Sequence, residues 1–445
     1  MKVRELSFQA VPSSSSQWRA RISQSIGFGV AAVFLAVSLV GSTTPATAAG
    51  RAIKVLTTQT RVSLIGPGTA PVISAGNVFL SAQLAKVKFS GNGTNFRVYA
   101  FNKLGRLLWS KTVTANHHPT NVTAVAVSQG VVYAGWFSRE FCCRVNEVYF
   151  YGGITGFKIV DGTTVFASDP GLTDSPGATS TPVISNGNIY SNFRFEVGGG
   201  VTSTQAYSVA SGAALFQTDA RAGTPSGPLA VYGNSLYVPD GNVLNVFPST
   251  VDNTCGFDLA FDPWHLFPRF CPSSWSLNIS GTWKIRAAPI VASGSLFVGG
   301  TDGKLYAFSA SGCGMTSCTP LWTATTDGPI VSSLTSNQGT VFVTTQNGTL
   351  YAYPVGGCSN STCAPLWKAT PGGSLTKSVI FGTSVYVGSS NGRVFQYAVS
   401  GCGSATCTPS LIANVGTPIS SEPAIGLGRL FVSDEQATLH IFKLP

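Results

Sequence analysis

The repeating unit of this chain is clearest in thirteen residues, Leu296-Phe297-Val298-Gly299-Gly300-Thr301-Asp302-Gly303-Lys304-Leu305-Tyr306-Ala307-Phe308. Apolar and aromatic residues on both sides of Asp302-Gly303 predict two short β-strands joined by a tight turn. An Asp-Gly pair favours a type I′ turn, which requires positive φ at both central positions. One hairpin buries too little surface to be stable alone, so a chain that repeats it is expected to stack the copies.

The same pattern recurs along the chain, centred on a triplet of an apolar, an aromatic and a small or apolar residue. The central aromatics are Phe79, Tyr133, Tyr190, Tyr237, Phe297, Phe342, Tyr386 and Phe431. Successive aromatics are separated by 54, 57, 47, 60, 45, 44 and 45 residues. A third strand usually follows each triplet, and a fourth often carries a Leu-Trp pair, as in Leu321-Trp322. Four strands in a period of about 45–50 residues are typical of a β-propeller blade.

The two ends of the chain complement each other. The eighth unit stops after three strands, at Ile441-Phe442-Lys443-Leu444-Pro445, and residues 53–64 form a lone strand-like segment before the first unit. Pairing the two would complete the last blade and remove two exposed sheet edges. We therefore predict an all-β fold: an eight-bladed β-propeller of four-stranded antiparallel blades, with the last blade closed by the N-terminal strand. Seven blades are expected if residues 122–168 are an irregular excursion.

The N-terminus has the pattern of an export signal. A basic region precedes an apolar run at residues 28–40, and Ala46-Thr47-Ala48 forms an A-x-A cleavage site. An uncleaved anchor is the alternative, but spanning a bilayer takes about 20 apolar residues and this run is shorter. We predict that residues 1–48 are a secretory signal peptide and that residues 50–445 are a single domain. The mature protein is then secreted or extracytoplasmic, at the cell envelope, with no membrane span.

Composition limits the possible partners. Only 10% of the residues are charged, against about 25% in typical domains. Of the net charge of +10, four bases and one acid lie in the leader, which leaves +7 on the mature chain. No Lys/Arg cluster is interleaved with aromatic residues, so nucleic-acid binding is not expected. A mildly basic surface could favour an anionic cell-envelope polymer, or could serve solubility alone. We expect a monomer.

The ten cysteines all follow the leader, as an oxidising compartment would allow. Three pairs share a Gly-Cys-x4-Cys spacing, namely Cys313 with Cys318, Cys358 with Cys363, and Cys402 with Cys407. Zinc sites usually need a second cysteine pair or histidines, and the chain has only four histidines. We predict disulfides that close short hairpin tips, each stabilising by about 2 kcal/mol. No metal site is predicted.

The longest interval between triplets contains an aromatic loop. A disulfide between Cys255 and Cys271 would tie its base, within a predicted insertion at residues 251–283. Its candidate binding residues are Trp264, His265, Phe267, Arg269 and Phe270. Exposed aromatics together with arginine are the residues that dominate recognition surfaces. The alternative is that the loop packs down, closing the channel mouth or covering a blade edge.

One unit shows a family resemblance. The run Ala206-Tyr207-Ser208-Val209-Ala210-Ser211-Gly212-Ala213-Ala214-Leu215-Phe216 resembles the A-x-D-x-x-T-G-x-x-x-W repeat of the pyrroloquinoline-quinone (PQQ) superfamily of eight-bladed propellers, with Phe216 in place of tryptophan. In later units a disulfide-tipped hairpin separates the glycine from Trp322 or Trp367. The resemblance covers nearly the whole mature chain. It implies the propeller fold and either of two functions: quinoprotein dehydrogenases bind PQQ and calcium in the channel, whereas members such as the outer-membrane assembly factor BamB are binding scaffolds.

Our leading hypothesis is a non-enzymatic binding or scaffold module for a protein or an envelope polymer, without a cofactor. The alternative is a PQQ-dependent oxidoreductase with calcium, because Cys142-Cys143 resembles the vicinal disulfide that stacks on PQQ in the family's alcohol dehydrogenases. Arg144 would then contact the quinone. The two cysteines could equally pair as a tight turn, or stay free, without a cofactor. A carbohydrate-acting enzyme would need paired carboxylates in the channel, and the sequence offers no evident pair.

Overall fold

The computed structural model describes residues 56, 58–65, 68–83, 96–113, 119–141, 148–167, 177–178, 180–194, 202–218, 227–251, 255, 269–279, 281, 284–313, 318–337 and 339–444. The chain divides into two units, Met1–Arg51 and Ala52–Pro445. The predicted signal peptide, residues 1–48, lies outside the described residues and stays a prediction. All the regular secondary structure in the described residues is β-strand, arranged in eight sheets.

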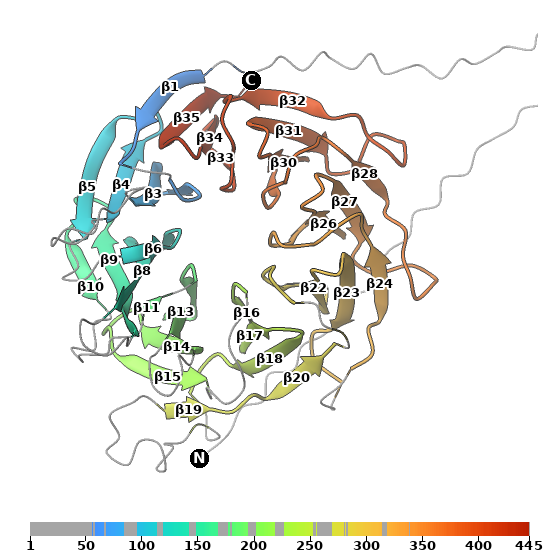
Figure 1. Ribbon diagram of the computed structural model, residues 1–445, viewed down its shortest axis with the longest axis horizontal. Helices are drawn as coiled ribbons and strands as arrows, with labels where there is room; N and C mark the ends of the chain where they lie inside the picture. Colours follow the sequence, from blue (N-terminus) through green and yellow to red (C-terminus); the bar gives the residue numbers. More distant parts are fainter. Residues whose placement is uncertain are drawn as a thin grey trace, which may run out of the picture. The chain divides into compact units, whose positions relative to one another are not determined.

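Each sheet is one blade, and we number the blades in chain order. The blades lie side by side in a ring (Figure 1). Of the first four, blades 1 and 4 have four strands each, blade 2 has five and blade 3 has six. Blade 1 contains β2 (Val72–Ser74), β3 (Asn77–Gln83), β4 (Phe96–Asn102) and β5 (Leu107–Val113). Blade 2 contains β6 (Pro119–Val122), β7 (Ala126–Ser128), β8 (Val131–Phe141), β9 (Val148–Lys158) and β10 (Thr164–Ala167). Blade 3 contains β11 (Gly177–Ala178), β12 (Val183–Ser185), β13 (Asn188–Arg194), β14 (Thr202–Ser208), β15 (Ala214–Thr218) and β19 (Arg269–Cys271). Blade 4 contains β16 (Ala230–Tyr232), β17 (Ser235–Asp240), β18 (Val243–Pro248) and β20 (Trp275–Asn278).

The last four blades have four strands each. Blade 5 contains β21 (Ile290–Ala292), β22 (Ser295–Gly299), β23 (Lys304–Ser309) and β24 (Trp322–Thr325). Blade 6 contains β25 (Thr335–Asn337), β26 (Thr340–Thr344), β27 (Leu350–Pro354) and β28 (Trp367–Ala369). Blade 7 contains β29 (Val379–Phe381), β30 (Ser384–Gly388), β31 (Arg393–Ala398) and β32 (Ser410–Asn414). Blade 8 contains β33 (Ala424–Gly426), β34 (Arg429–Ser433), β35 (Thr438–Lys443) and the N-terminal strand β1 (Thr58–Ser63).

The ring is closed by the two ends of the described chain. Strand β1 pairs antiparallel with β35, with Thr60 opposite Ile441 and Val62 opposite Leu439. The inner strand of blade 1, β2, contacts both β7 of blade 2 and β33 of blade 8. The eight-bladed fold and its closure by the N-terminal strand are therefore confirmed. The described residues 119–141 and 148–167 form one blade, so they are not an irregular excursion.

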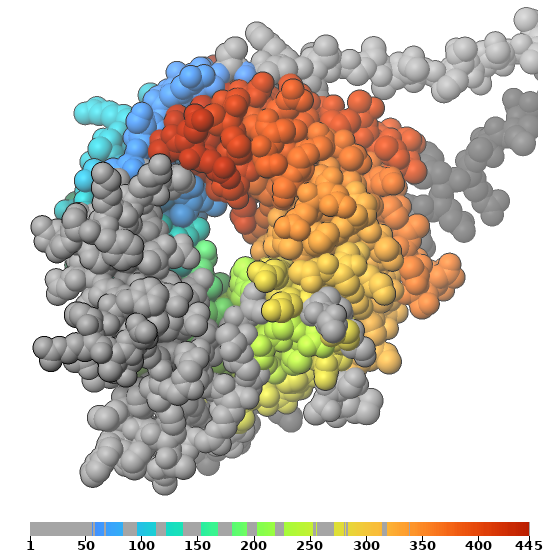
Figure 2. All heavy atoms as spheres, viewed as in Figure 1, coloured from blue at the N-terminus to red at the C-terminus, as the bar shows by residue number. Residues whose placement is uncertain are grey.

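The hydrophobic core lies between blades. Eight buried clusters are present, and each is contributed mainly by two neighbouring blades. The cluster between blades 5 and 6 contains Phe297, Trp322, Val341 and Tyr353, all less than 5% exposed. A single blade leaves these apolar faces uncovered, so each blade depends on both neighbours for stability. The space-filling view shows the ring hollowed at its centre (Figure 2).

The glycine and tryptophan of the repeat meet between blades. Trp322 of blade 5 packs on Gly357 of blade 6, and Trp367 of blade 6 packs on Gly401 of blade 7, so close that a Cβ atom on either glycine would collide with the indole. The Trp367 Nε1–H also donates a hydrogen bond to the Val399 carbonyl oxygen, 3.3 Å away. The fourth strand of one blade is thus fixed against the third–fourth strand connection of the next.

The turn at Asp302-Gly303 differs from the prediction. Strands β22 and β23 are separated by four residues, 300–303, and only Gly303 has positive φ (+77°). The Gly303 N–H bonds to the Gly300 carbonyl at 3.2 Å, which is a type I turn ending in a left-handed glycine. The type I′ prediction is therefore wrong for this turn, because that geometry belongs to two-residue loops. It occurs instead between β21 and β22, where Ser293 (φ 48°) and Gly294 (φ 77°) both have positive φ.

Candidate functional site

The ring has two rims with different connections. Because neighbouring strands of a blade run antiparallel, the second–third strand turns and the segments that lead into the inner strands share one rim. The first–second strand turns and the third–fourth strand connections, which carry the three disulfide hairpins, share the other. We call the first the cavity rim, after a cavity described below, and the second the disulfide rim. The predicted aromatic insertion follows β18, a third strand, so it leaves the blade at the disulfide rim.

The predicted insertion is only partly described. Trp264, His265 and Phe267 lie outside the described residues, whereas Arg269 and Phe270 begin β19. This strand pairs parallel with β15, the outer strand of blade 3. At backbone level, Arg269 and Phe270 therefore cover a blade edge, which was the structural alternative. Partner contact by the five residues stays a prediction. The span 251–283 also contains β20, the fourth strand of blade 4.

The four disulfides form as their spacing predicts. They join Cys255 to Cys271, Cys313 to Cys318, Cys358 to Cys363 and Cys402 to Cys407. Two of the hairpin disulfides also fasten neighbouring blades. The Cys363 N–H bonds to the Thr323 carbonyl of the preceding blade at 2.7 Å, and the Cys407 N–H bonds to the Lys368 carbonyl at 2.8 Å. Each hairpin thus adds a short parallel bridge to the outer edge of the blade before it.

The residues predicted for the quinone alternative, Cys142, Cys143 and Arg144, lie outside the described residues. The strands that flank them, β8 and β9, are the second and third of blade 2, so their joined ends lie at the cavity rim. Within the described part of the chain, no three His, Cys, Asp or Glu side chains come together as metal ligands would. The described residues also contain no helix long and apolar enough to cross a membrane.

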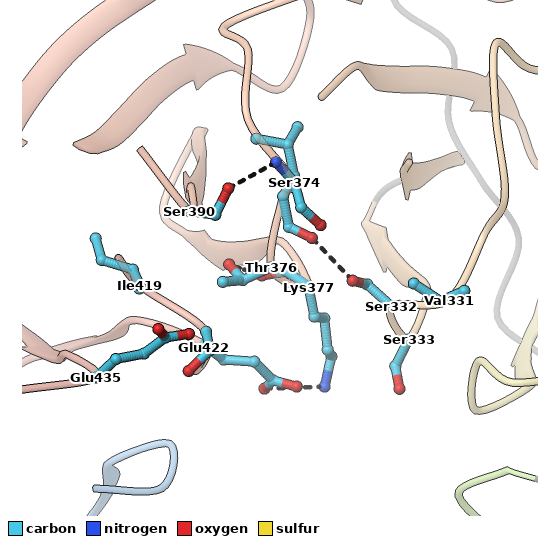
Figure 3. A pocket seen from close by; sticks show the side chains of 12 residues that line it. Val331, Ser332, Ser333, Ser374, Thr376, Lys377, Ser390, Ile419, Glu422 and Glu435 are labelled. Atoms are coloured by element: carbon cyan, nitrogen blue, oxygen red, sulfur yellow. Dashed lines mark hydrogen bonds and ion pairs between the residues drawn. The ribbon is translucent and has the colours of Figure 1, made fainter. Parts of the chain in front are cut away.

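A cavity of about 400 Å³ opens at the cavity rim where blades 6, 7 and 8 meet (Figure 3). Its walls are the segments that lead into the inner strands β25, β29 and β33, together with the second–third strand turns of blades 7 and 8. Its polar side chains include Ser332, Ser374, Lys377, Ser390, Glu422 and Glu435. Three blades thus contribute hydroxyl and charged groups to one recess.

Hydrogen bonds hold these walls in place. Ser332 Oγ of blade 6 donates to the Leu375 carbonyl of blade 7 at 2.9 Å. The Ser374 N–H donates to Ser390 Oγ at 3.0 Å, which ties the entering segment of blade 7 to its own turn. Lys377 Nζ of blade 7 lies 3.5 Å from Glu422 Oε2 of blade 8, and both side chains are about one-third exposed (34% and 39%). The cavity is therefore formed before any ligand arrives.

The blade 8 wall rests on a buried carboxylate. Asp434 Oδ2 accepts a hydrogen bond from Thr417 Oγ1 at 2.6 Å and lies 2.8 Å from His440 Nε2. Its Oδ1 accepts from the N–H of Thr438 at 2.9 Å. Burial disfavours the charged form, but the hydrogen bonds from Thr417 and His440 together hold the pKa of Asp434 below its ordinary value. Asp434 thus fixes the turn that carries Glu435 against the segment that enters β33.

The sequence interpretation did not single out the cavity residues. Ser333, Lys377 and Glu422 are separated by 44 and 45 residues, which is the same period as the strand aromatics of these blades. This shared period was the available signal, since equal positions in successive blades become neighbours around the ring. Glu422 and Glu435 both line this rim cavity, whereas the expectation that the channel holds no evident carboxylate pair stays a prediction.

These observations define the class of the protein: an eight-bladed β-propeller with a polar cavity at one rim. Residues 273–399 match the family model described as "Outer membrane protein assembly factor BamB". The resemblance to the PQQ-repeat superfamily is thus confirmed for residues 273–399. A comparison with curated proteins found no match.

Among the solved structures that share the fold are a BamB, a quinohemoprotein alcohol dehydrogenase and a designed protein. BamB from Moraxella catarrhalis is 15% identical, with a TM-score of 0.57 over 88% of this chain and 98% of that one. The quinohemoprotein alcohol dehydrogenase from Comamonas testosteroni is 13% identical, with a TM-score of 0.55 over 88% of this chain and 78% of that one. The computationally designed Ika8 protein is 13% identical, with a TM-score of 0.58 over 86% of this chain and 98% of that one. At these identities the similarity shows the fold alone.

Proposed function

We propose that this protein is a secreted or cell-envelope β-propeller that acts as a non-enzymatic binding or scaffold module for a protein or an anionic envelope polymer. The observation that carries the proposal is the preformed cavity where blades 6, 7 and 8 meet. Its volume of about 400 Å³ lies in the range of about 300–1,000 Å³ that ligand sites occupy. Because its walls are already ordered, a ligand need not supply the free energy to order them.

The chemistry of the cavity favours binding over catalysis. Two of its hydroxyls hold the walls, since Ser332 donates to a carbonyl and Ser390 accepts from a backbone N–H. A serine nucleophile would need a histidine or another base within hydrogen-bond reach. The titratable side chains that line the cavity are Lys377, Glu422 and Glu435, and the first two neutralise each other.

Two observations support a location outside the cytoplasm. Four disulfides form in the structure, and disulfides persist in oxidising compartments. The matching family model carries the description of an outer-membrane assembly factor, which supports a place at the cell envelope. Residues 1–48 are then the export signal, and the mature protein starts near residue 50.

Site-specific photo-crosslinking in the producing cells tests the proposal. A photoreactive residue at Ser333, at the edge of the cavity, is expected to form a discrete adduct with an envelope protein or polymer. The same residue at Val160, which is 82% exposed in the third–fourth strand connection of blade 2, serves as the control for random collisions. A further position, Trp264, tests the predicted aromatic loop. Absence of any adduct from Ser333 and Trp264 would contradict a binding function.

The quinoprotein alternative has its own test. The mature protein is incubated with PQQ and calcium, and dye reduction is followed with several alcohols and aldose sugars. We expect no turnover. Sustained turnover that is abolished by Cys142→Ser would overturn the non-enzymatic proposal and assign the vicinal cysteines to a cofactor site.

A further inference from the structure

Two charged residues of the cavity, Lys377 and Glu422, occupy a position that is neutral in the other six blades. In every blade the first residue paired in the inner strand lies opposite the aromatic of the second strand, as Val379 lies opposite Tyr386 and Ala424 opposite Phe431. The residue two positions earlier is therefore equivalent in all eight blades. These residues are Ala70, Ala124, Thr181, Pro228, Ala288, Ser333, Lys377 and Glu422. Only blades 7 and 8 place a charge there.

The second–third strand turns show the same concentration of charge. The residue two positions after the paired end of the second strand is Thr301 in blade 5, Gln346 in blade 6, Ser390 in blade 7 and Glu435 in blade 8. Among blades 5–8, only blade 8 has an acid at this position. The repeat does not require these charges, and in the regular blades they gather at one point of the rim, on the cavity (Figure 3).

The charge that remains in the cavity is negative. Lys377 and Glu422 neutralise each other across the blade 7–blade 8 boundary, at 3.5 Å. Glu435 is exposed, and among the described residues its carboxylate has no hydrogen-bond or salt-bridge partner. The cavity therefore carries about one uncompensated negative charge on a mature chain whose net charge is +7. Such a local reversal favours a cationic group and disfavours an anion.

The position of Glu435 is fixed by its neighbours. Its own N–H bonds to the Pro418 carbonyl at 3.1 Å, and the adjacent Asp434 is held by Thr417, Thr438 and His440. The turn is thus fastened both to β35 and to the segment that enters β33. Only the side-chain torsions of Glu435 remain to be ordered by a ligand, which keeps the entropic cost of binding low.

We propose that this cavity binds a lysine or arginine side chain of a protein partner, with the cationic head group at Glu435. The inference rests on the proposed binding function and names its ligand. Hydroxyl and backbone groups of the walls can bond to the peptide next to that side chain, and about 400 Å³ suits a side chain with its adjoining backbone. An anionic polymer would meet Glu435 and find Lys377 already paired with Glu422.

The experiment uses the mature, disulfide-intact protein and four fluorescein-labelled peptides, Gly-Ser-X-Ser-Gly, in which X is Lys, Arg, Gln or Glu. Fluorescence anisotropy at low salt is expected to show binding of the Lys and Arg peptides and at least fivefold weaker binding of the Gln and Glu peptides. Glu435→Gln is expected to lower the affinity for the Lys peptide by about fivefold, as for the loss of a partly exposed ion pair. Lys377→Gln is expected to raise the affinity for the Lys peptide, because Glu422 then loses its salt-bridge partner and its negative charge is no longer neutralised.

Asp161→Asn is the matched control. It removes one carboxylate from an exposed turn at the disulfide rim of blade 2, so the net charge changes equally and the cavity does not. We expect it to leave peptide affinity unchanged, and thermal melting checks that each variant is folded. Equal losses for Glu435→Gln and Asp161→Asn would overturn the inference in favour of general electrostatics.

Two further results would also overturn the inference. The first is tighter binding of the Glu peptide or of polyphosphate, with affinity lost in the Lys377→Gln variant. The second is equal affinity for all four peptides. Crosslinks from Ser333 separate this failure from that of the proposed function. If they persist while the peptides fail, the rim binds a partner by other chemistry. If they are also absent, the binding function fails too.

Discussion

The outer strands of blades 5 and 6 and of blade 3 are covered in the same way, by disulfide-closed connections of two different lengths. We call blades 5–8 the regular half of the ring and blades 1–4 the irregular half. In the regular half, a hairpin closed by cysteines five positions apart bonds to the outer strand of the preceding blade, as the Cys363 N–H does to the Thr323 carbonyl. In the irregular half, the insertion does the same with a whole strand, since Cys271 of β19 lies opposite Thr218 of β15. In each of these pairs the second cysteine is the one placed on the neighbouring blade.

The comparison changes the meaning of the insertion. By sequence it is an exception to the period, and its aromatic residues suggest a dedicated binding loop. In the structure it occupies the same third–fourth strand connection as the three hairpins, with a disulfide that spans 16 residues instead of 5. The cavity, by contrast, lies at the opposite rim and within the most regular blades. The cavity and the irregular insertion therefore lie at opposite rims, so the irregular stretch of sequence does not mark the position of the cavity.

The largest effect is expected where two regular blades share their core. Trp322 is 4% exposed, and its ring centroid lies 5.8 Å from that of Phe297 and 6.4 Å from that of Tyr353. Trp322→Ala is expected to lower the free energy of unfolding by about 3–5 kcal/mol, because the blade 5–blade 6 cluster loses its central ring. Urea denaturation with intact disulfides measures it.

Leu321→Ala is the control for this prediction, because Leu321 is adjacent in sequence but 58% exposed. Its effect is expected to stay within about 0.5 kcal/mol. If Trp322→Ala changed stability no more than Leu321→Ala, the inter-blade clusters would not be the core of the ring. A second transition in urea would show instead that the regular half unfolds apart from the irregular half.

The next-largest effect is expected from removing disulfides, and it differs between the long connection of the insertion and the short hairpins. Replacing Cys255 and Cys271 together by serine is expected to cost about 3 kcal/mol, and replacing Cys358 and Cys363 together about 2 kcal/mol, because the longer loop restricts the unfolded chain more. Urea denaturation under non-reducing conditions measures both. The reverse order would show that the hairpin disulfides act mainly through their bridges to the preceding blade and not through loop closure.

A third prediction concerns the second–third strand turn of blade 8, whose residues differ from those of blades 5 and 6. Blade 8 has His440 where blades 5 and 6 have Tyr306 and Tyr351, and the histidine holds the buried Asp434. The pKa of Asp434 is lowered in the folded state, so its stabilisation is present above the ordinary aspartate value of about 4 and is lost as the pH falls below it. Asp434→Asn is expected to cost about 1–3 kcal/mol at pH 7 and progressively less below pH about 4.

Urea unfolding at pH 7, 4 and 3 measures this difference. Asp302→Asn is the matched variant, since Asp302 lies in the corresponding turn of blade 5 but is exposed. It is expected to change stability by less than about 1 kcal/mol at each pH. A cost of Asp434→Asn that did not vary with pH would contradict an ionised carboxylate as the source of the stabilisation.

The fold could be predicted because its signal is periodic. The aromatics Phe297, Phe342, Tyr386 and Phe431 recur every 44 or 45 residues, and each side chain must be buried between blades. Ring closure followed from a count of strands at the two ends. The cavity could not be found in the same way, because Ser333, Lys377 and Glu422 are ordinary residues in their own segments. They form a site only after three blades are placed side by side.

Turn geometry was also beyond the sequence pattern. Asp302-Gly303 is the stronger type I′ signal, yet the four-residue loop selects a type I turn with a left-handed glycine. The true type I′ turns join the inner two strands and contain weaker pairs, such as Ser293-Gly294 and Leu427-Gly428. The number of loop residues depends on the register of the two strands. This loop length determines the turn type, and it outweighs the residue preference of Asp-Gly.

The smallest effect is expected at one of these turns, and it is a gain. Leu427 has φ 56° and is 38% exposed, so it holds a left-handed conformation that its branched side chain disfavours. In blade 3 the equivalent position is Asn186, with φ 51°. Leu427→Asn is expected to stabilise the protein by about 0.5–1 kcal/mol, because asparagine adopts this region at lower cost. Leu427→Ala is the control: it removes the same exposed apolar surface but keeps the strain, so a gain of equal size with alanine would assign the effect to the surface and not to the turn.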